Sequence, residues 1–145
     1  MMARDAADAV VARRTAVLQQ EIDSFGPNHS ATVRARVGLA VALAADHQYA
    51  AAVRESTEVV RVRDSVLGAT DPETILARRL LVTYLARNGE WGRAAAVYEP
   101  LIEASMAAWG PKSYRTLGSR VNFCNCLKRI GRNVDAGVEL REILA

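Results

Sequence analysis

Three segments of this chain align with one another without a gap, at a spacing of 42 residues. They cover residues 25–66, 67–108 and 109–145, and each opens on a large apolar residue followed by a glycine. Further columns hold a threonine, an arginine and several apolar residues at fixed offsets. The opening, threonine and arginine columns are Phe25, Leu67 and Trp109; Thr32, Thr74 and Thr116; and Arg36, Arg78 and Arg120. Such self-similarity predicts a repeat architecture in which each unit packs against its neighbours.

The segment before the first unit fits the second half of the same pattern, because Val17 and Leu18 align with Val59 and Val60. The chain is therefore predicted to be a single domain, 1–145, that holds a half repeat (1–24), two whole repeats (25–66 and 67–108) and a shortened one (109–145). With 145 residues, it is long enough to bury a real core.

Each unit is predicted to form two helices, so the fold class is all-α with seven helices. Apolar residues such as Val33, Val37 and Ala40 recur with the period of an amphipathic helix. Asp71 is a suitable N-cap, and Gly89 suits the left-handed position after a helix end. The first helices of the pairs are expected at 33–45, 75–87 and 117–129.

The links and turns resemble those of the tetratricopeptide repeat, in the long-loop variety typified by kinesin light chain. That variety has a Gly-x-x-His-Pro-x-Thr-like link and an Asn-Gly-x-Tyr-x-x-Ala-like turn. The link here reads Gly26-Pro27-Asn28-His29-Ser30-Ala31-Thr32, and the second turn reads Asn88-Gly89-Glu90-Trp91-Gly92-Arg93-Ala94. The third unit departs from the pattern, with Ser113-Tyr114 in place of His-Pro and Asn133 in place of the aromatic residue.

The resemblance implies a right-handed superhelical solenoid of antiparallel helix pairs, with a concave face lined by the first helix of each pair. It also implies a protein-binding role without a shared catalytic site. Repeats of this kind often form segments of larger bacterial regulatory or signalling proteins.

Charge divides unevenly between the two kinds of helix, although the net charge is only +3. The expected second helices are acidic on balance, whereas the expected first helices contain no Asp or Glu. The bases of the first helices are Arg34, Arg36, Arg78, Arg79, Arg87, Arg120, Lys128 and Arg129. The face that the first helices line is therefore expected to favour an acidic or carboxylate-bearing partner.

Not all of these bases are expected to face the groove. The repeated arginines, Arg36, Arg78 and Arg120, are expected to brace one helix pair against the next through an acid on the preceding helix or a backbone carbonyl. Helical geometry gives a set of groove candidates that includes Val37 and Val41. The predicted peptide-binding residues are Arg34, Arg79, Thr83, Arg87, Asn122, Asn125, Lys128 and Arg129. Asparagine and arginine can together bind a peptide backbone or carboxylate, and the alternative is a solvated polar face.

We expect no catalytic site, metal site or cofactor, because no nucleophile is paired with a base and no phosphate-binding loop occurs. His29 is expected to cap a helix. Cys124 is expected to pack in the core and Cys126 to lie on a helix surface. Trp91, Trp109 and Tyr98 match apolar columns and are expected to be core residues before they are binding residues.

Two other functions stay open. Apolar helix faces near Val17-Leu18 or Ile143-Leu144 could pair with a second copy and form a homodimer. Nucleic-acid binding by the basic face is disfavoured by the net charge of +3 and the scarcity of aromatic residues. No apolar run is long enough for a membrane-spanning helix, and a cytoplasmic location is expected.

Overall fold

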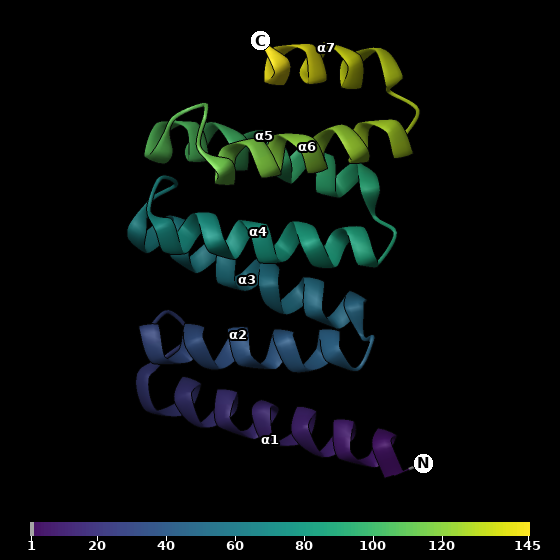
Figure 1. The fold of residues 1–145 in the computed structure, drawn as a ribbon. Coiled ribbons are helices and arrows are strands. Elements are labelled where there is room, and N and C mark those ends of the chain that lie inside the picture. The colour runs from purple at the N-terminus through teal and green to yellow at the C-terminus, as the bar shows by residue number, and fades with distance from the viewer. Residues whose placement is uncertain (1) are drawn as a thin grey trace.

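The computed structural model describes residues 2–145, and this part of the chain forms seven helices stacked in chain order (Figure 1). The helices are α1 (Met2–Phe25), α2 (Ser30–Ala45), α3 (Tyr49–Leu67), α4 (Pro72–Arg87), α5 (Trp91–Trp109), α6 (Tyr114–Arg129) and α7 (Asn133–Leu144). Each packs mainly on the helices before and after it in the sequence, so α1 and α7 lie at opposite ends of the stack. The predicted all-α class and the number of helices are confirmed.

The helix starts keep the 42-residue period, at Ser30, Pro72 and Tyr114 for the first helices of the pairs. These starts lie three residues before the predicted ones, because a side chain just ahead of each helix caps it. His29 Nδ1 accepts a hydrogen bond from the Ala31 amide at 3.1 Å. Asp71 and Ser113 make the equivalent bonds at 2.9 and 3.4 Å, as expected of N-caps. The capping roles predicted for His29 and Asp71 are confirmed, and Glu73 and Arg115 fall inside the first helices.

The turn within each pair places one residue in the left-handed region. Gly89 and Gly131 have φ values of 75° and 81°, as their position after a helix end predicts. In the first unit the same column holds His47, with φ of 58°.

The threonine column ties each first helix to the preceding part of the chain. Thr32, Thr74 and Thr116 are fully buried. Thr32 and Thr116 donate to the carbonyls of Gly26 and Gly110 at 2.6 and 2.9 Å, and Thr74 donates to the Arg63 carbonyl at 3.2 Å. A buried hydroxyl without such an acceptor would be destabilising, so the repeated threonine fixes the link in one conformation.

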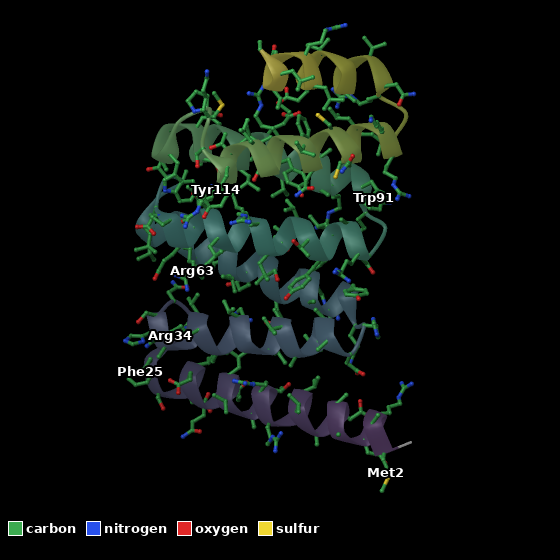
Figure 2. All side chains as sticks on the ribbon, viewed as in Figure 1. Met2, Phe25, Arg34, Arg63, Trp91 and Tyr114 are labelled. Carbon is green, nitrogen blue, oxygen red and sulfur yellow. The ribbon has the colours of Figure 1, made fainter. Side chains whose placement is uncertain are left out.

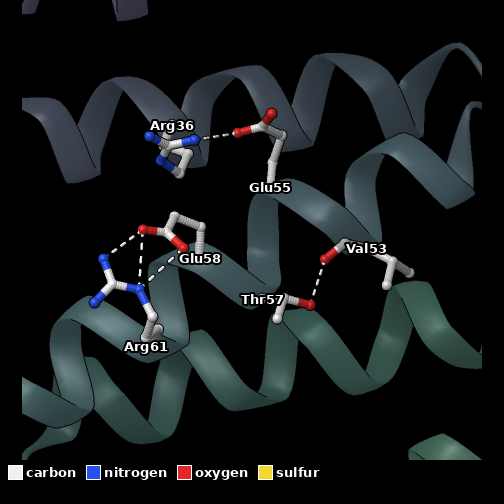
Figure 3. Close-up of polar contacts among 6 residues, drawn as sticks. All are labelled: Arg36, Val53, Glu55, Thr57, Glu58 and Arg61. Carbon is white, nitrogen blue, oxygen red and sulfur yellow. Dashed lines mark hydrogen bonds and ion pairs between the residues drawn. The ribbon is translucent and has the colours of Figure 1, made fainter. Parts of the chain in front are cut away.

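The arginine column braces the helices in two different ways. Arg36 pairs with Glu55 of α3 at 2.8 Å (Figure 3). Arg120 pairs with Glu139 of α7 at 2.6 Å in the same manner. The expected acid on the preceding helix is therefore wrong for these two arginines, whose partners lie on the following helix.

Arg78 is the exception, because Val97 stands where the other units have Glu55 and Glu139. Its guanidinium instead reaches Asp64 of the preceding helix at 3.2 Å and the Ala69 carbonyl at 3.5 Å. The prediction is correct for this middle unit alone. As a result, α5 has no ion pair to α4 or α6 within residues 2–145.

The core is continuous from α1 to α6 and includes Leu18, Ile75 and Leu101. A separate apolar cluster joins α6 to α7 around Leu127 and Ala136. None of the helices within residues 2–145 combines the length and apolar character needed to cross a membrane.

Candidate functional site

Two adjoining hollows, with volumes of about 690 and 620 Å³, are lined by residues of α4, α5 and α6, and the larger one also by Val37 of α2 and by Val59 and Arg63 of α3. They share Thr83, Tyr98 and Asn122, and we refer to them together as the groove. The larger one, the apolar hollow, lies over the N-terminal halves of α4 and α6. The smaller one, the basic hollow, lies over their C-terminal ends. The groove is thus built mainly by first helices, with α5 beneath them.

The apolar hollow exposes large side chains that a fold would normally bury. Leu76 and Tyr114 are 62% and 77% exposed, and the apolar lining also includes Leu80 and Val37. The one acid in its lining, Glu73, is paired with Arg63. Exposed apolar surface at the edge of a hollow is a feature of ligand-binding surfaces.

The basic hollow carries Arg87, Lys128 and Arg129 beside Asn122 and Asn125, and its lining contains no Asp or Glu. None of its three cations belongs to an ion pair within residues 2–145. They lie in the last turns of α4 and α6, where the negative end of the helix dipole favours basic residues. Their N–H groups remain available to an anion.

Tyr98 forms the floor where the two hollows meet, and its side chain is 6% exposed. Burial raises the pKa of this phenol to about 12, with a further rise from Cys126 and opposing effects of Arg79 and a hydrogen bond with Asn122. The hydroxyl is therefore protonated near neutral pH. It can take part in hydrogen bonds at the floor, but it is a poor nucleophile.

Two arginines of α6 stack on tryptophans of α5. The Arg115 guanidinium lies 4.7 Å from the Trp109 ring centroid, and that of Arg129 lies 4.8 Å from Trp91. Figure 2 shows Tyr114, the neighbour of Arg115, and Trp91 at opposite sides of the stack. Each end of the groove therefore has one arginine held against an aromatic ring.

All eight predicted site residues are exposed. Six line the basic hollow: Thr83, Arg87, Asn122, Asn125, Lys128 and Arg129. Arg79 lines the apolar hollow, as does Val37. Arg34 and Val41 lie outside both hollows, on α2. Peptide binding by these residues stays a prediction, but seven of the eight lie along one groove.

The sequence reasoning missed Arg115, Leu76 and Tyr114 as groove residues. Arg115 lies outside the helix expected at 117–129, so helical projection did not include it. The serine of the N-cap column, Ser113, was the signal that could have placed Arg115 in the first turn. Leu76 shares a column with Arg34 and Gly118, so its apolar side chain gave no repeated pattern.

Both cysteines are free and buried, Cys124 at 1% and Cys126 at 2% exposure. The expectation of a surface thiol is wrong for Cys126, because its side of α6 packs into the core cluster that contains Tyr98. Burial raises the pKa of both thiols, which lowers the thiolate fraction near neutral pH. Within residues 2–145 no three His, Cys, Asp or Glu side chains gather as metal ligands.

The stacked helix pairs and the groove define a solenoid of the tetratricopeptide-like class. No family model and no curated protein sequence matches the chain. The match is instead to solved structures. One is a kinesin-light-chain-type protein of Podosopora anserina with nearly identical TPR-like repeats, which is 18% identical. It is matched over 98% of this chain and 67% of its own, with a TM-score of 0.82.

A variant of the same Podosopora anserina protein gives a TM-score of 0.81, also at 18% identity and with the same coverage of the two chains. BtubC (BKLC) from P. vanneervenii is 11% identical and matches over 96% of this chain and 56% of its own, with a TM-score of 0.79. This chain thus spans between about half and two thirds of the matched structures. The predicted resemblance to long-loop tetratricopeptide repeats is confirmed for the fold.

Proposed function

We propose that the chain is a non-catalytic scaffold that binds an acidic or carboxylate-bearing peptide segment of a protein partner in the groove. The observation that carries the proposal is the charge of the groove lining. The lining includes five cations outside the ion pairs of residues 2–145: Arg79, Arg87, Arg115, Lys128 and Arg129. Its single acid, Glu73, is already paired.

The apolar hollow adds a second requirement to the partner. Leu76 and Tyr114 are exposed next to Arg79 and Arg115, so a segment that carries both apolar and acidic side chains can satisfy both kinds of surface. Burial of the apolar side chains would supply affinity at about 25 cal/mol per Å² before the costs of association. The cations would supply specificity for acidic sequences and a faster association rate.

The test is a selection from a random peptide library in which each peptide is linked to the nucleic acid that encodes it. The purified protein is the bait. We expect the enriched peptides to be acidic and to contain apolar residues. The triple variant R79E/R87E/R129E should bind the enriched peptides about 100-fold more weakly, since each reversal replaces an attraction by a repulsion worth about 1 kcal/mol. Fluorescence anisotropy of labelled peptides measures the change.

The matched control is R4E/R13E/R141E, which makes the same change in net charge. These three arginines are exposed and lie on α1 and α7, away from the groove. The control should keep most of the affinity of the unmodified protein. Equal weakening by both triple variants, or enrichment of peptides without acidic residues, would contradict the proposed groove.

Self-association is a second candidate, favoured by the outer face of α7. Val134, Val138 and Leu144 are 80%, 42% and 84% exposed. Ile102 of α5, the equivalent of Leu144, is 8% exposed, whereas Gly92 and Ala96, the equivalents of Val134 and Val138, are exposed as well. A second copy could cover this apolar face of α7. Light scattering at increasing protein concentration should show a dimer, and the variant V134E/V138E should remain a monomer. A monomeric mass of the unmodified protein at millimolar concentration would rule out self-association.

A further inference from the structure

We propose that Trp91 and Trp109 position Arg129 and Arg115 as two anion-binding anchors of the groove. The two anchors would select partner segments whose acidic residues lie at two points about six residues apart. This inference rests on the proposed function, and it adds the spacing of the acids and the role of the two tryptophans.

The spacing follows from the position of the anchors on one helix. Arg115, Asn122 and Arg129 are seven residues apart on α6, so all three lie on nearly the same face. Arg115 and Arg129 are thus separated by 14 residues. At about 1.5 Å per helical residue this is about 21 Å, the length of about six residues of extended peptide.

The stacking leaves N–H donors of both arginines available to a ligand, while Nε of Arg115 also donates to the Tyr114 hydroxyl at 3.2 Å. A guanidinium that lies over an aromatic face directs its N–H groups outward in its own plane, where they can donate to both oxygens of a carboxylate. Arg129 also lines the basic hollow and Arg115 the apolar hollow, so both guanidinium groups adjoin the groove. The rings restrict both side chains before binding, which lowers the entropy lost when an acid is captured.

The tryptophans also fix the anchors relative to each other. Trp91 and Trp109 are the first and last residues of α5, so both arginines are held at the ends of one helix. Within residues 2–145 no ion pair connects α5 to α6, and these two contacts are the charged side-chain contacts across that joint. The distance between the anchors is therefore set by α5 and α6 together.

The surface between the anchors can accommodate a peptide backbone. Gly118 is exposed, and an added Cβ would meet no atom within 4 Å. Asn122 and Asn125 supply amide groups that can bind peptide N–H and C=O groups. Two acids that bind Arg115 and Arg129 would place the segment between them along this stripe.

The probes are synthetic fluorescein-labelled peptides of one alanine and leucine sequence that carry two Glu residues, placed two, six or ten positions apart. Fluorescence anisotropy against the full chain at low salt gives the dissociation constants. We expect the six-residue spacing to bind at least about tenfold more tightly than the other two. The emission of Trp91 and Trp109, the two tryptophans of the protein, should shift when this peptide binds.

The variants Trp91→Leu and Trp109→Leu should each remove the preference for six residues, whereas Trp91→Phe and Trp109→Phe keep a ring for stacking and should retain it. Arg129→Gln removes one anchor at an exposed position and should have the same effect as Trp91→Leu without disturbing the core. Circular dichroism of each variant establishes that it is folded.

Equal affinity at all three spacings overturns the inference, as does a spacing preference that survives Arg129→Gln and both leucine variants. If the peptides bind and R79E/R87E weakens them, but neither spacing nor the tryptophans matter, the proposed function stands and only the two-anchor arrangement is wrong. If none of the peptides binds at any spacing, both proposals are wrong.

Discussion

His47 occupies the backbone position that glycine holds in the other two units. Its φ of 58° is in the left-handed region, which costs an L-residue with a β-carbon about 1 kcal/mol. A contact of 3.0 Å between His47 Nδ1 and the Tyr49 hydroxyl offsets part of this cost.

We predict that His47→Gly raises the free energy of unfolding by about 0.5 kcal/mol, because glycine adopts this conformation without strain. Urea denaturation followed by circular dichroism measures the change. His47→Ala should lower the stability, since it keeps the strain and loses the contact with Tyr49. A stability of His47→Gly below that of His47→Ala would show that strain at this position is negligible.

Tyr98 should make the stability depend on pH above about 10. Burial is the main cause of its raised pKa, about 12 in the folded protein. A tyrosine in the unfolded chain ionises near 10, so the contribution of the protonated phenol is fully present below pH 10 and is lost as the pH rises toward 12. We expect a loss of about 1 kcal/mol by pH 11 that Tyr98→Phe removes. Denaturation at pH 9, 10 and 11 tests this, and parallel curves for both proteins would contradict it.

The sequence predicted some side chains of the groove and missed the contacts of others. Helical projection placed Arg87, Asn122 and Asn125 on the same face, because the period of a helix is a local property. It did not predict that Trp91 lies under Arg129, because that contact joins two helices whose relative rotation depends on packing. The burial of Cys126 was missed for the same reason.

Pairs of helices differ in how they are braced, and the difference follows from one column of the repeat. Arg120 and Glu139 are 11% and 18% exposed, so their ion pair is screened little by solvent. Glu142, the second partner, is 61% exposed and contributes less. The second unit has Val97 in the acidic column, and its pair of helices is joined by apolar contacts such as those of Leu85 and Leu101.

A double-mutant cycle on Arg120→Met and Glu139→Gln should therefore give a coupling free energy of about 1 to 2 kcal/mol. The matched cycle on Arg78→Met and Val97→Ala should give a value near zero, because these two side chains form no ion pair. Chemical denaturation of the four proteins in each cycle supplies the values. Equal coupling in the two cycles would show that the repeated arginine acts through packing alone.

At the level of the helices, the sequence predicted where the first helices lie but not which side chains join neighbouring helices. The caps and the 42-residue period placed the start of the first helix of each pair to within three residues. The direction of the arginine pairs could not be predicted, because an acid on either neighbouring helix can reach the same column. The three-dimensional arrangement was needed to show that Val97 redirects Arg78 toward Asp64.

The whole molecule is held together by contacts between helices that are neighbours in the sequence. The free energy of unfolding of such a stack is approximately the sum of contributions from its units and from the interfaces between them. A destabilising substitution at one end should therefore affect mainly the helices near it. Leu127, 2% exposed, belongs to the cluster that joins α6 to α7.

We predict that Leu127→Ala lowers the free energy of unfolding by about 2 to 4 kcal/mol. It should speed amide exchange in α6 and α7 but not in α1–α3. Ile75→Ala, at a fully buried position in the middle of the stack, should speed exchange in all seven helices. Hydrogen–deuterium exchange with mass spectrometry resolves the helices. A uniform increase in Leu127→Ala would mean that the stack unfolds as one cooperative unit.

The equal spacing of the units along the sequence has a consequence for how such a chain can change. Recombination between two of its own copies adds or removes a whole multiple of 42 residues. Every capping residue, buried threonine and left-handed turn then stays in register with its helix. Loss of a single residue inside a helix would instead rotate all following side chains of that helix by about 100°. Gain or loss of an entire helix pair is thus a smaller perturbation to this architecture than the deletion of one amino acid.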